Sequence, residues 1–193
     1  MERSAALDVV RKYSEKDITF RHLVSVEGVM RALARHFGEN EHRWGLAGLF
    51  HDLDMDTTHG DPERHAKQTC EWLRAEGFDD PEVLNAIMGH MYESHQTDRM
   101  STAIVHADGI AGLLVACALV RPDKALGMKV SSVKKKLKEK SFAPGVERDK
   151  IWDVEERIGI PMDEFIRISI VGLQEVAPEI GLAPDTQRRS APA

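Results

Sequence analysis

The sequence predicts an all-helical fold, and three observations support this. Apolar residues recur at intervals of three and four along most of the chain, as one buried face of a helix requires. The helix-start signal Asp-Pro-Glu occurs at residues 61–63 and 80–82, where Asp can cap free backbone N–H groups and proline fits the first helical turn. No segment is convincing as a strand. With 193 residues, 42% of them hydrophobic, the chain can bury one substantial core.

The N-terminal half is expected to form four helices in succession. The first covers residues 22–38, and its apolar positions keep helical spacing: Leu23, Val26, Val29, Met30, Leu33 and Phe37. The second covers about 41–51. The two Asp-Pro-Glu signals begin a third helix over about 61–77 and a fourth over about 80–90. His65 is therefore expected in the opening turns of the third helix.

The C-terminal half is also expected to be helical. A long apolar helix over 101–120 is stopped by Arg121-Pro122. A loop at 142–145 precedes a short helix over about 150–158 and a last helix over 162–176. The last helix is apolar over more than one face, so it could cover the core, a second copy in a homodimer, or both.

We find no internal repeat and no interdomain linker. The sequence therefore predicts a single domain over residues 1–180, with a core at about 19–120 and a helical extension at about 124–180. Residues 183–193 are rich in Pro, Arg and Ser, and we expect a disordered tail there.

Composition restricts the location and the partners that we expect. No uninterrupted apolar stretch is long enough to cross a bilayer, and residues 1–4 lead into polar sequence without a signal-peptide region. Cys70 and Cys117 provide neither a disulfide framework nor a metal-binding pair. We therefore expect a cytoplasmic protein with no membrane partner.

The charge distribution is uneven. The net charge of −6 argues against general nucleic-acid binding. Residues 124–150 nevertheless carry a net charge of +6, which leaves −12 for the rest of the chain. An amphipathic helix with a solvated, Lys-rich face is the plainer interpretation of this segment. A wall that attracts phosphate groups is the functional one.

Histidine and aspartate residues follow one another in a distinctive order along the predicted helices. The set consists of His22, the adjacent pair His51 and Asp52, His65, His90 and Asp108. Imidazole and carboxylate groups together suit divalent transition metals. A single buried histidine is more often a hydrogen-bonded core residue than a ligand, so the ordered set is the signal.

This order, with its local sequence context, resembles the HD superfamily of metal-dependent phosphohydrolases over about residues 19–120. The stretches that carry the resemblance are Arg21–Val26, Trp44–Asp52 and Ala107–Ile110. The resemblance implies an HD-type helical bundle and a minimal one-metal site formed by His22, His51, Asp52 and Asp108. For branches of the family with two metals, it implies that His65 and His90 hold the second ion and that Asp52 bridges the two.

The resemblance also implies the chemistry. One or two divalent ions are expected as cofactors, with iron or manganese preferred and zinc, nickel, cobalt or magnesium as alternatives. A metal ion lowers the pKa of bound water, so a metal-bound hydroxide can attack a phosphate ester near neutral pH. The expected function is hydrolysis of a small phosphate ester, with a nucleotide or dinucleotide as the best guess. An HD-type di-iron oxygenase and a non-catalytic metal- or nucleotide-binding module remain as alternatives.

Four further residues are candidates for the site. With His51 and Asp52 as catalytic residues, Asp54 could orient a ligating histidine or act as an acid toward the leaving group. Substrate binding is assigned to His95, to Lys134 in the basic segment, and to Arg148, whose guanidinium could bind phosphate in a fork. Ordinary surface roles are the alternative for all four.

Overall fold

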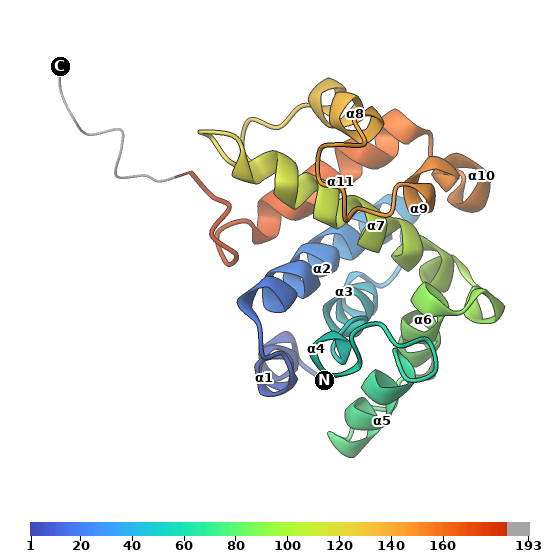
Figure 1. Ribbon diagram of the computed structural model, residues 1–193. Coiled ribbons are helices and arrows are strands. Elements are labelled where there is room, and N and C mark those ends of the chain that lie inside the picture. The colour runs from blue at the N-terminus through green and yellow to red at the C-terminus, as the bar shows by residue number, and fades with distance from the viewer. Residues whose placement is uncertain (185–193) are drawn as a thin grey trace, which may run out of the picture.

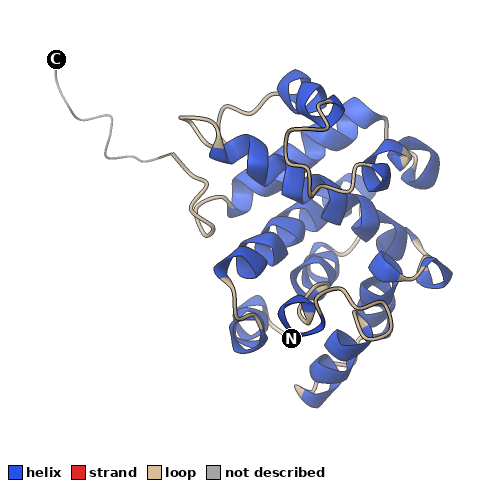
Figure 2. Cartoon of the chain, in the orientation of Figure 1, coloured by secondary structure: helices blue, strands red, loops and turns tan. Residues whose placement is uncertain are grey.

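Two long helices, α2 (Asp17–Phe37) and α7 (Arg99–Leu119), form the centre of the fold (Figure 1). The computed structural model describes residues 1–184, and within that range it contains helices and loops but no strand (Figure 2). This confirms the all-helical prediction. The expected tail at 183–193 lies almost wholly outside the described residues.

On one side of α2 lies the N-terminal part of the chain. Helix α1 (Arg3–Tyr13) and helix α2 both pack against α3 (Glu41–Phe50). The short α4 (Met55–Thr58) leads to α5 (Lys67–Ala75), which packs against α6 (Pro81–Met91). A single 3-10 turn, η1 (Glu93–His95), then connects α6 to α7, and α6 and α7 lie against each other.

The helical extension covers the other side of α7. Helices α8 (Val130–Lys138), α9 (Asp149–Trp152) and α10 (Val154–Ile158) all contact α7, and α11 (Met162–Val176) lies along α2 (Figure 1). The approach of α2 and α11 depends on two glycines. A Cβ on Gly28 would collide with the carbonyl oxygen of Gly172, and a Cβ on Gly172 with that of Gly28.

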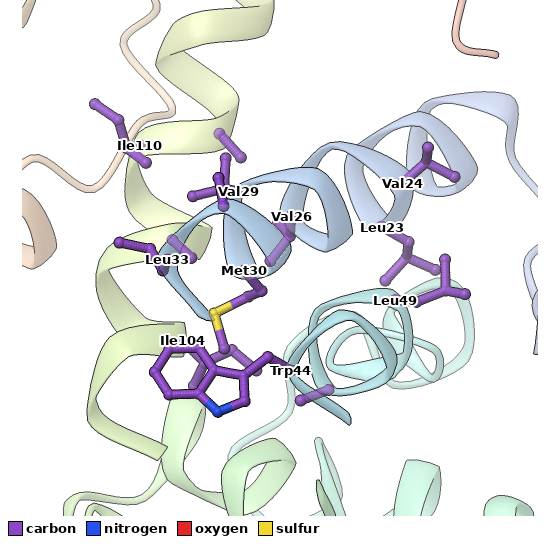
Figure 3. Close-up of a cluster of buried hydrophobic side chains, with 14 of the residues drawn as sticks. Leu23, Val24, Val26, Val29, Met30, Leu33, Trp44, Leu49, Ile104 and Ile110 are labelled. Atoms are coloured by element: carbon purple, nitrogen blue, oxygen red, sulfur yellow. The ribbon is translucent and has the colours of Figure 1, made fainter. Parts of the chain in front are cut away.

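The core lies between α2, α3 and α7, as Figure 3 shows. Its side chains follow the helical spacing that the sequence predicts for residues 22–38, and they include Leu23, Val26, Val29, Met30 and Leu33 from α2, Trp44 and Leu49 from α3, and Ile104 and Ile110 from α7. Helix α7 is long and apolar enough to cross a membrane by length and composition alone. Most of its apolar stretch is buried against neighbouring helices, which accounts for its hydropathy.

The second Asp-Pro-Glu signal marks a true helix start, and the first does not. Asp80 accepts hydrogen bonds from the backbone N–H groups of Glu82 and Val83, and α6 begins at Pro81 as predicted. The helix predicted from Asp61 begins only at Lys67. The residues between form turns, and Ala66 has a φ of +67°, which interrupts a helix at that point. His65 therefore lies in a turn rather than in a helix.

Other boundaries differ in smaller ways. Helix α2 begins at Asp17, so His22 lies one turn inside it rather than at its start. The helix predicted over 150–158 is divided into α9 and α10 at Asp153. The prediction of 162–176 for the last helix matches α11, and helix α1 was not predicted.

Candidate metal centre

The six residues of the ordered His-Asp set come together where α2, α3, α6 and α7 meet. They form two groups that share one residue. The first group is His22, His51, Asp52 and Asp108, and the second is Asp52, His65 and His90. Within each group, one ligand atom from every residue lies within 4.8 Å of the others. The helix packing thus gathers side chains from over eighty residues of sequence into one centre.

Close packing of α3 against α2 sets the position of the central His-Asp pair. A Cβ on Gly48 would stand 2.8 Å from the carbonyl oxygen of Val26, so only glycine allows the two helices to approach this closely. His51 follows directly after α3 and is fully buried. Its Nδ1 donates to the carbonyl oxygen of Gly48 at 2.9 Å, which leaves Nε2 directed at His22.

The ligand atoms of the first group have the spacing of a mononuclear site. His22 Nε2 lies 3.2 Å from His51 Nε2 and 3.2 Å from Asp108 Oδ1. Asp52 Oδ2 lies 3.6 Å from His22 Nε2 and 3.5 Å from His51 Nε2. Ligand atoms about 2.1 Å from a tetrahedral ion stand roughly 3.4 Å apart. The first group therefore fits a divalent ion whose ligand atoms lie about 2.1 Å away.

The second group is as tight, and it uses the other oxygen of Asp52. Asp52 Oδ1 lies 3.2 Å from Nε2 of both His65 and His90, and those two nitrogens are 3.0 Å apart. Oδ2 faces the first group and Oδ1 the second, so Asp52 has the geometry of a carboxylate that bridges two ions.

The protonation of the imidazoles explains why a cation belongs between them. Nδ1 of His51 and Nδ1 of His90 each face a backbone carbonyl oxygen, of Gly48 and Ile87, which can only accept a hydrogen bond. In the neutral ring, Nε2 then carries a lone pair and no proton. Lone pairs and carboxylate oxygens converge on the same two points, and a divalent ion at each would satisfy them. The donor set therefore fits metal ions.

Asp54 supports the second group from behind. Its side chain is fully buried, and its Oδ1 accepts a hydrogen bond from His65 Nδ1 at 2.7 Å. Its Oδ2 accepts from the backbone N–H of Thr69 at 3.2 Å. A carboxylate in this position fixes the ring orientation and the tautomer of a ligating histidine. The geometry thus favours an orienting role for Asp54 over a role as acid toward the leaving group.

The charges of the centre shift the pKa of several members. Burial by itself would raise the pKa of Asp52, but the neighbouring His51, His65 and His90 lower it well below its usual range. Burial would likewise raise the pKa of Asp108, yet hydrogen bonds from His22 and His51 lower it well below its usual range. Both carboxylates are therefore ionised and available as ligands at neutral pH.

His65 is shifted in the opposite direction. Burial favours its neutral form, but hydrogen bonds with Asp52 and Asp54 outweigh burial and raise its pKa to about 9. A metal ion at the second group must therefore displace a proton from His65 near neutral pH.

Two openings lead to the first group. A cavity of about 310 Å³ lies beside His22 and Asp108 and is lined by α7 and by the loop between α8 and α9, through Gly109, Gly112, Ala143, Gly145, Val146 and Glu147. A second cleft of about 550 Å³ also borders His22. Its walls are mostly apolar and include Ile18, Gly112, Val115, Leu119 and Leu182, together with Asp17 and Arg21. A substrate can thus reach His22 and Asp108 through the first opening and His22 through the second.

The three residues expected to bind substrate are not brought to these openings. His95 lines a separate groove between α5 and α6, where its Nδ1 lies 3.0 Å from Asn85 Oδ1. Lys134 is ion-paired with Asp163 at 2.5 Å on the outer side of the extension. Arg148 donates five hydrogen bonds to backbone carbonyls, those of Leu137, Glu139, Phe142, Ala143 and Val146. An arginine engaged in this way holds the loop together and has no N–H group left for a phosphate fork.

Lys150, which the sequence did not single out, does reach the centre. Its Nζ lies 3.0 Å from Asp108 Oδ2. Burial by itself would lower the pKa of Lys150, but the carboxylates of Asp108 and Glu147 raise it above its usual value. The general basic character of residues 124–150 was a signal. Nothing in the sequence distinguished this lysine from its neighbours.

Comparison with known proteins relates this chain to a protein family and to a bacterial ribonuclease. The sequence matches the family described as HD domain over residues 19–131. It is also 31% identical, over 91 residues, to Ribonuclease Y 2 of Levilactobacillus brevis. That alignment covers 47% of this chain and 17% of the ribonuclease, so the similarity concerns a small part of the longer protein. No solved structure matches this chain.

Proposed function

This chain belongs to the HD-domain family of metal-dependent phosphohydrolases, and we propose that it hydrolyses a phosphate ester of a small molecule, with a nucleotide or dinucleotide as the preferred substrate. One observation carries the proposal: two groups of metal-ligating side chains share Asp52, and the first of them adjoins a cavity through His22 and Asp108. A carboxylate that bridges two ion positions is the arrangement needed to act on a phosphate from both sides.

Each residue has a definite task in this proposal. His22, His51 and Asp108 would hold the first ion, His65 and His90 the second, and Asp52 both. When bound, divalent ions supply an activated water and withdraw negative charge from the phosphorus centre. Asp54 keeps the His65 ring in its ligating orientation. His51, His65 and His90 are buried, so bulk water does not reach these three ligands from behind the site.

The remaining expectations about partners stay proposals. We propose a cytoplasmic location and a small phosphorylated substrate, and we propose neither a membrane nor, because of the net charge of −6, a nucleic acid as partner. The relative's name, ribonuclease, makes phosphodiesters a reasonable addition to the substrates that are assayed. The apolar side chains of α11 are mostly buried within the chain against α2, α7 and α8, so a homodimer stays a proposal with no surface assigned to it.

Metal content per chain is the measurement that tests the proposal. Elemental mass spectrometry on protein prepared without chelators or a histidine tag should find about two ions per chain. His65→Ala should reduce this to about one, and His51→Ala should impair the first site. Phosphate release is then assayed with nucleotides, dinucleotides and simple esters. No metal in any preparation, including anaerobic reconstitution, would sink the proposal. Oxygen consumption by an iron-loaded protein that releases no phosphate would favour the oxygenase alternative.

A further inference from the structure

Lys150 comes from a part of the chain that lies beyond the family match. That match ends at residue 131, whereas Lys150 belongs to α9, which packs against α7 (Figure 1). Its ammonium group is nevertheless 3.0 Å from Asp108, a member of the first ligand group. Building on the proposed function, we propose that Lys150 binds an oxygen of the substrate's phosphate group, so that the helical extension completes the substrate site of the HD domain.

The two oxygens of Asp108 face different neighbours. Oδ1 is directed at His22 and His51, at 3.2 and 3.7 Å, whereas Oδ2 is directed at Lys150. Lys150 therefore stands next to the first ion position without occupying it. Asp108 and Glu147 both line the cavity of about 310 Å³, and both lie within 3.1 Å of Lys150 Nζ, so the ammonium group stands next to two residues of the cavity wall although Lys150 itself is not part of that wall.

The hydrogen-bonding capacity of Lys150 leaves room for a ligand. An ammonium group has three N–H donors. Asp108 Oδ2 accepts a hydrogen bond from one of them at 3.0 Å, and Glu147 Oε2 lies 3.1 Å from Nζ as an ion-pair partner; the described part of the chain gives Nζ no further side-chain partner. The side chain is 27% exposed, so an oxygen of a bound anion can reach it. The cavity volume corresponds to roughly ten water molecules, which is ample for a phosphate group.

Several contacts hold Lys150 in this position. Arg148 binds five carbonyl oxygens of the segment 137–146 and so fixes the loop that leads into α9. His106, two residues before Asp108 on α7, donates from Nδ1 to the carbonyl oxygen of Lys150 at 2.6 Å. A Cβ on Gly109 would stand 3.1 Å from Lys150 Cβ, so glycine at this position allows α9 to lie close to α7. A lysine fixed in this way is preorganised for an anion.

Binding of inorganic phosphate tests the inference without requiring turnover. Calorimetric titration of Mn²⁺-loaded protein compares the unmodified chain with Lys150→Met, Lys150→Arg, Glu147→Gln and a control, Lys12→Met. Lys12 is likewise ion-paired with a carboxylate, Glu76, but lies on α1 and lines neither opening to the centre among the described residues. Metal content is measured on every variant.

The expected results differ among the variants. Loss of a charged hydrogen bond in Lys150→Met should weaken phosphate binding about tenfold or more, with metal content unchanged. Lys150→Arg should recover part of the affinity. Glu147→Gln should bind phosphate more tightly, because it removes a negative charge from the cavity and a competing ion-pair partner from Lys150. It also keeps the inference testable if Lys150→Met does not fold. Lys12→Met should bind like the unmodified chain.

Two results would overturn the inference. Unchanged phosphate affinity in Lys150→Met would remove Lys150 from the substrate site, and loss of metal in that variant would instead make it a positioning residue for Asp108. The proposed function fails separately. If the loaded protein binds phosphate through Lys150 but releases none from any ester, the anion site stands and the hydrolase does not. If esters are hydrolysed, Lys150→Met should raise KM with little change in kcat.

Discussion

Asp54→Asn is the substitution that most directly tests how the second ligand group is supported. The change is isosteric, so an oxygen can still accept the hydrogen bond that His65 Nδ1 now donates over 2.7 Å. The negative charge is lost, in a fully buried position where solvent screens it little, and the new amide nitrogen faces the backbone N–H of Thr69, which loses its acceptor. A hydrogen bond to a charged group contributes about 1.5–3 kcal/mol and a neutral one about 0.5–1.5 kcal/mol. The difference of about 1–1.5 kcal/mol corresponds to roughly tenfold weaker metal binding at the second group.

The assay is a competition titration of metal-loaded protein with a chelator of known affinity. The unmodified protein is expected to release its metal in two steps, one for each ligand group. In Asp54→Asn, only the step that belongs to the second group should shift to a lower chelator concentration. His65→Ala, which removes a ligand of that group, identifies which step this is.

Asp56→Asn is the matched control for this titration. Asp56 is also buried, but its carboxylate accepts hydrogen bonds from the backbone N–H groups of Glu15 and Lys16 and from the Thr19 hydroxyl. Loss of the Asp56 carboxylate should lower the free energy of unfolding and leave both metal-release steps unchanged. Metal release that is the same in Asp54→Asn as in the unmodified protein would refute the reasoning. It would mean that packing, rather than charge, orients His65.

Three further predictions concern pH and packing. In metal-free protein, His65 has a pKa of about 9, above its ordinary value of 6.5, so protonation stabilises the fold. That contribution, on the order of 3 kcal/mol, is fully present below about pH 6.5 and lost as the pH rises through about 9, and urea unfolding of chelator-treated protein between pH 6 and 9.5 should detect it. Gly28→Ala should lower the free energy of unfolding by about 1–3 kcal/mol, because the new Cβ would collide with Gly172. Gly145→Ala has open space around the new Cβ among the described residues and should lower it little. The denaturation midpoints of the two variants test this. Arg148→Lys loses the hydrogen bonds from the guanidinium to five backbone carbonyls and should lower the free energy of unfolding by about 1–2 kcal/mol. Amide hydrogen exchange in residues 139–147 should become faster, and unchanged exchange there would contradict the role given to this side chain.

Helix boundaries could be predicted wherever the signal was local. The capping carboxylate of Asp80 and the proline after it act on the first turn of their own helix, and α6 begins there. The same signal at Asp61 failed because long-range contacts decide the conformation of the following residues. The ring of His65 is held by Asp54 and lies beside Asp52 and His90, and Ala66 takes a positive φ in the same turn. Interactions between distant segments outweighed the local preference for a helix.

Charge alone could not predict which cation of the basic segment lies beside the ligand groups. The basic segment contains many similar cations, and sequence reasoning favoured Arg148 and Lys134. In the folded chain Arg148 is engaged by backbone carbonyls and Lys134 by Asp163, while Lys150 reaches Asp108. Which lysine faces the centre depends on the path of the loop between α8 and α9. The loop sequence has no periodic apolar pattern from which that path could be predicted.

The sequence by itself determined the fold class, the set of His and Asp residues and their order along the chain, because helical periodicity and residue chemistry are properties of local segments. The tertiary structure decided how those residues divide into two groups about Asp52, that Asp54 lies behind His65, and that Lys150 joins the centre from the extension. These features depend on helices approaching one another at Gly28, Gly48 and Gly109, where a Cβ would hold them apart. Distances between side chains remote in sequence are set by that packing, and no local pattern encodes them.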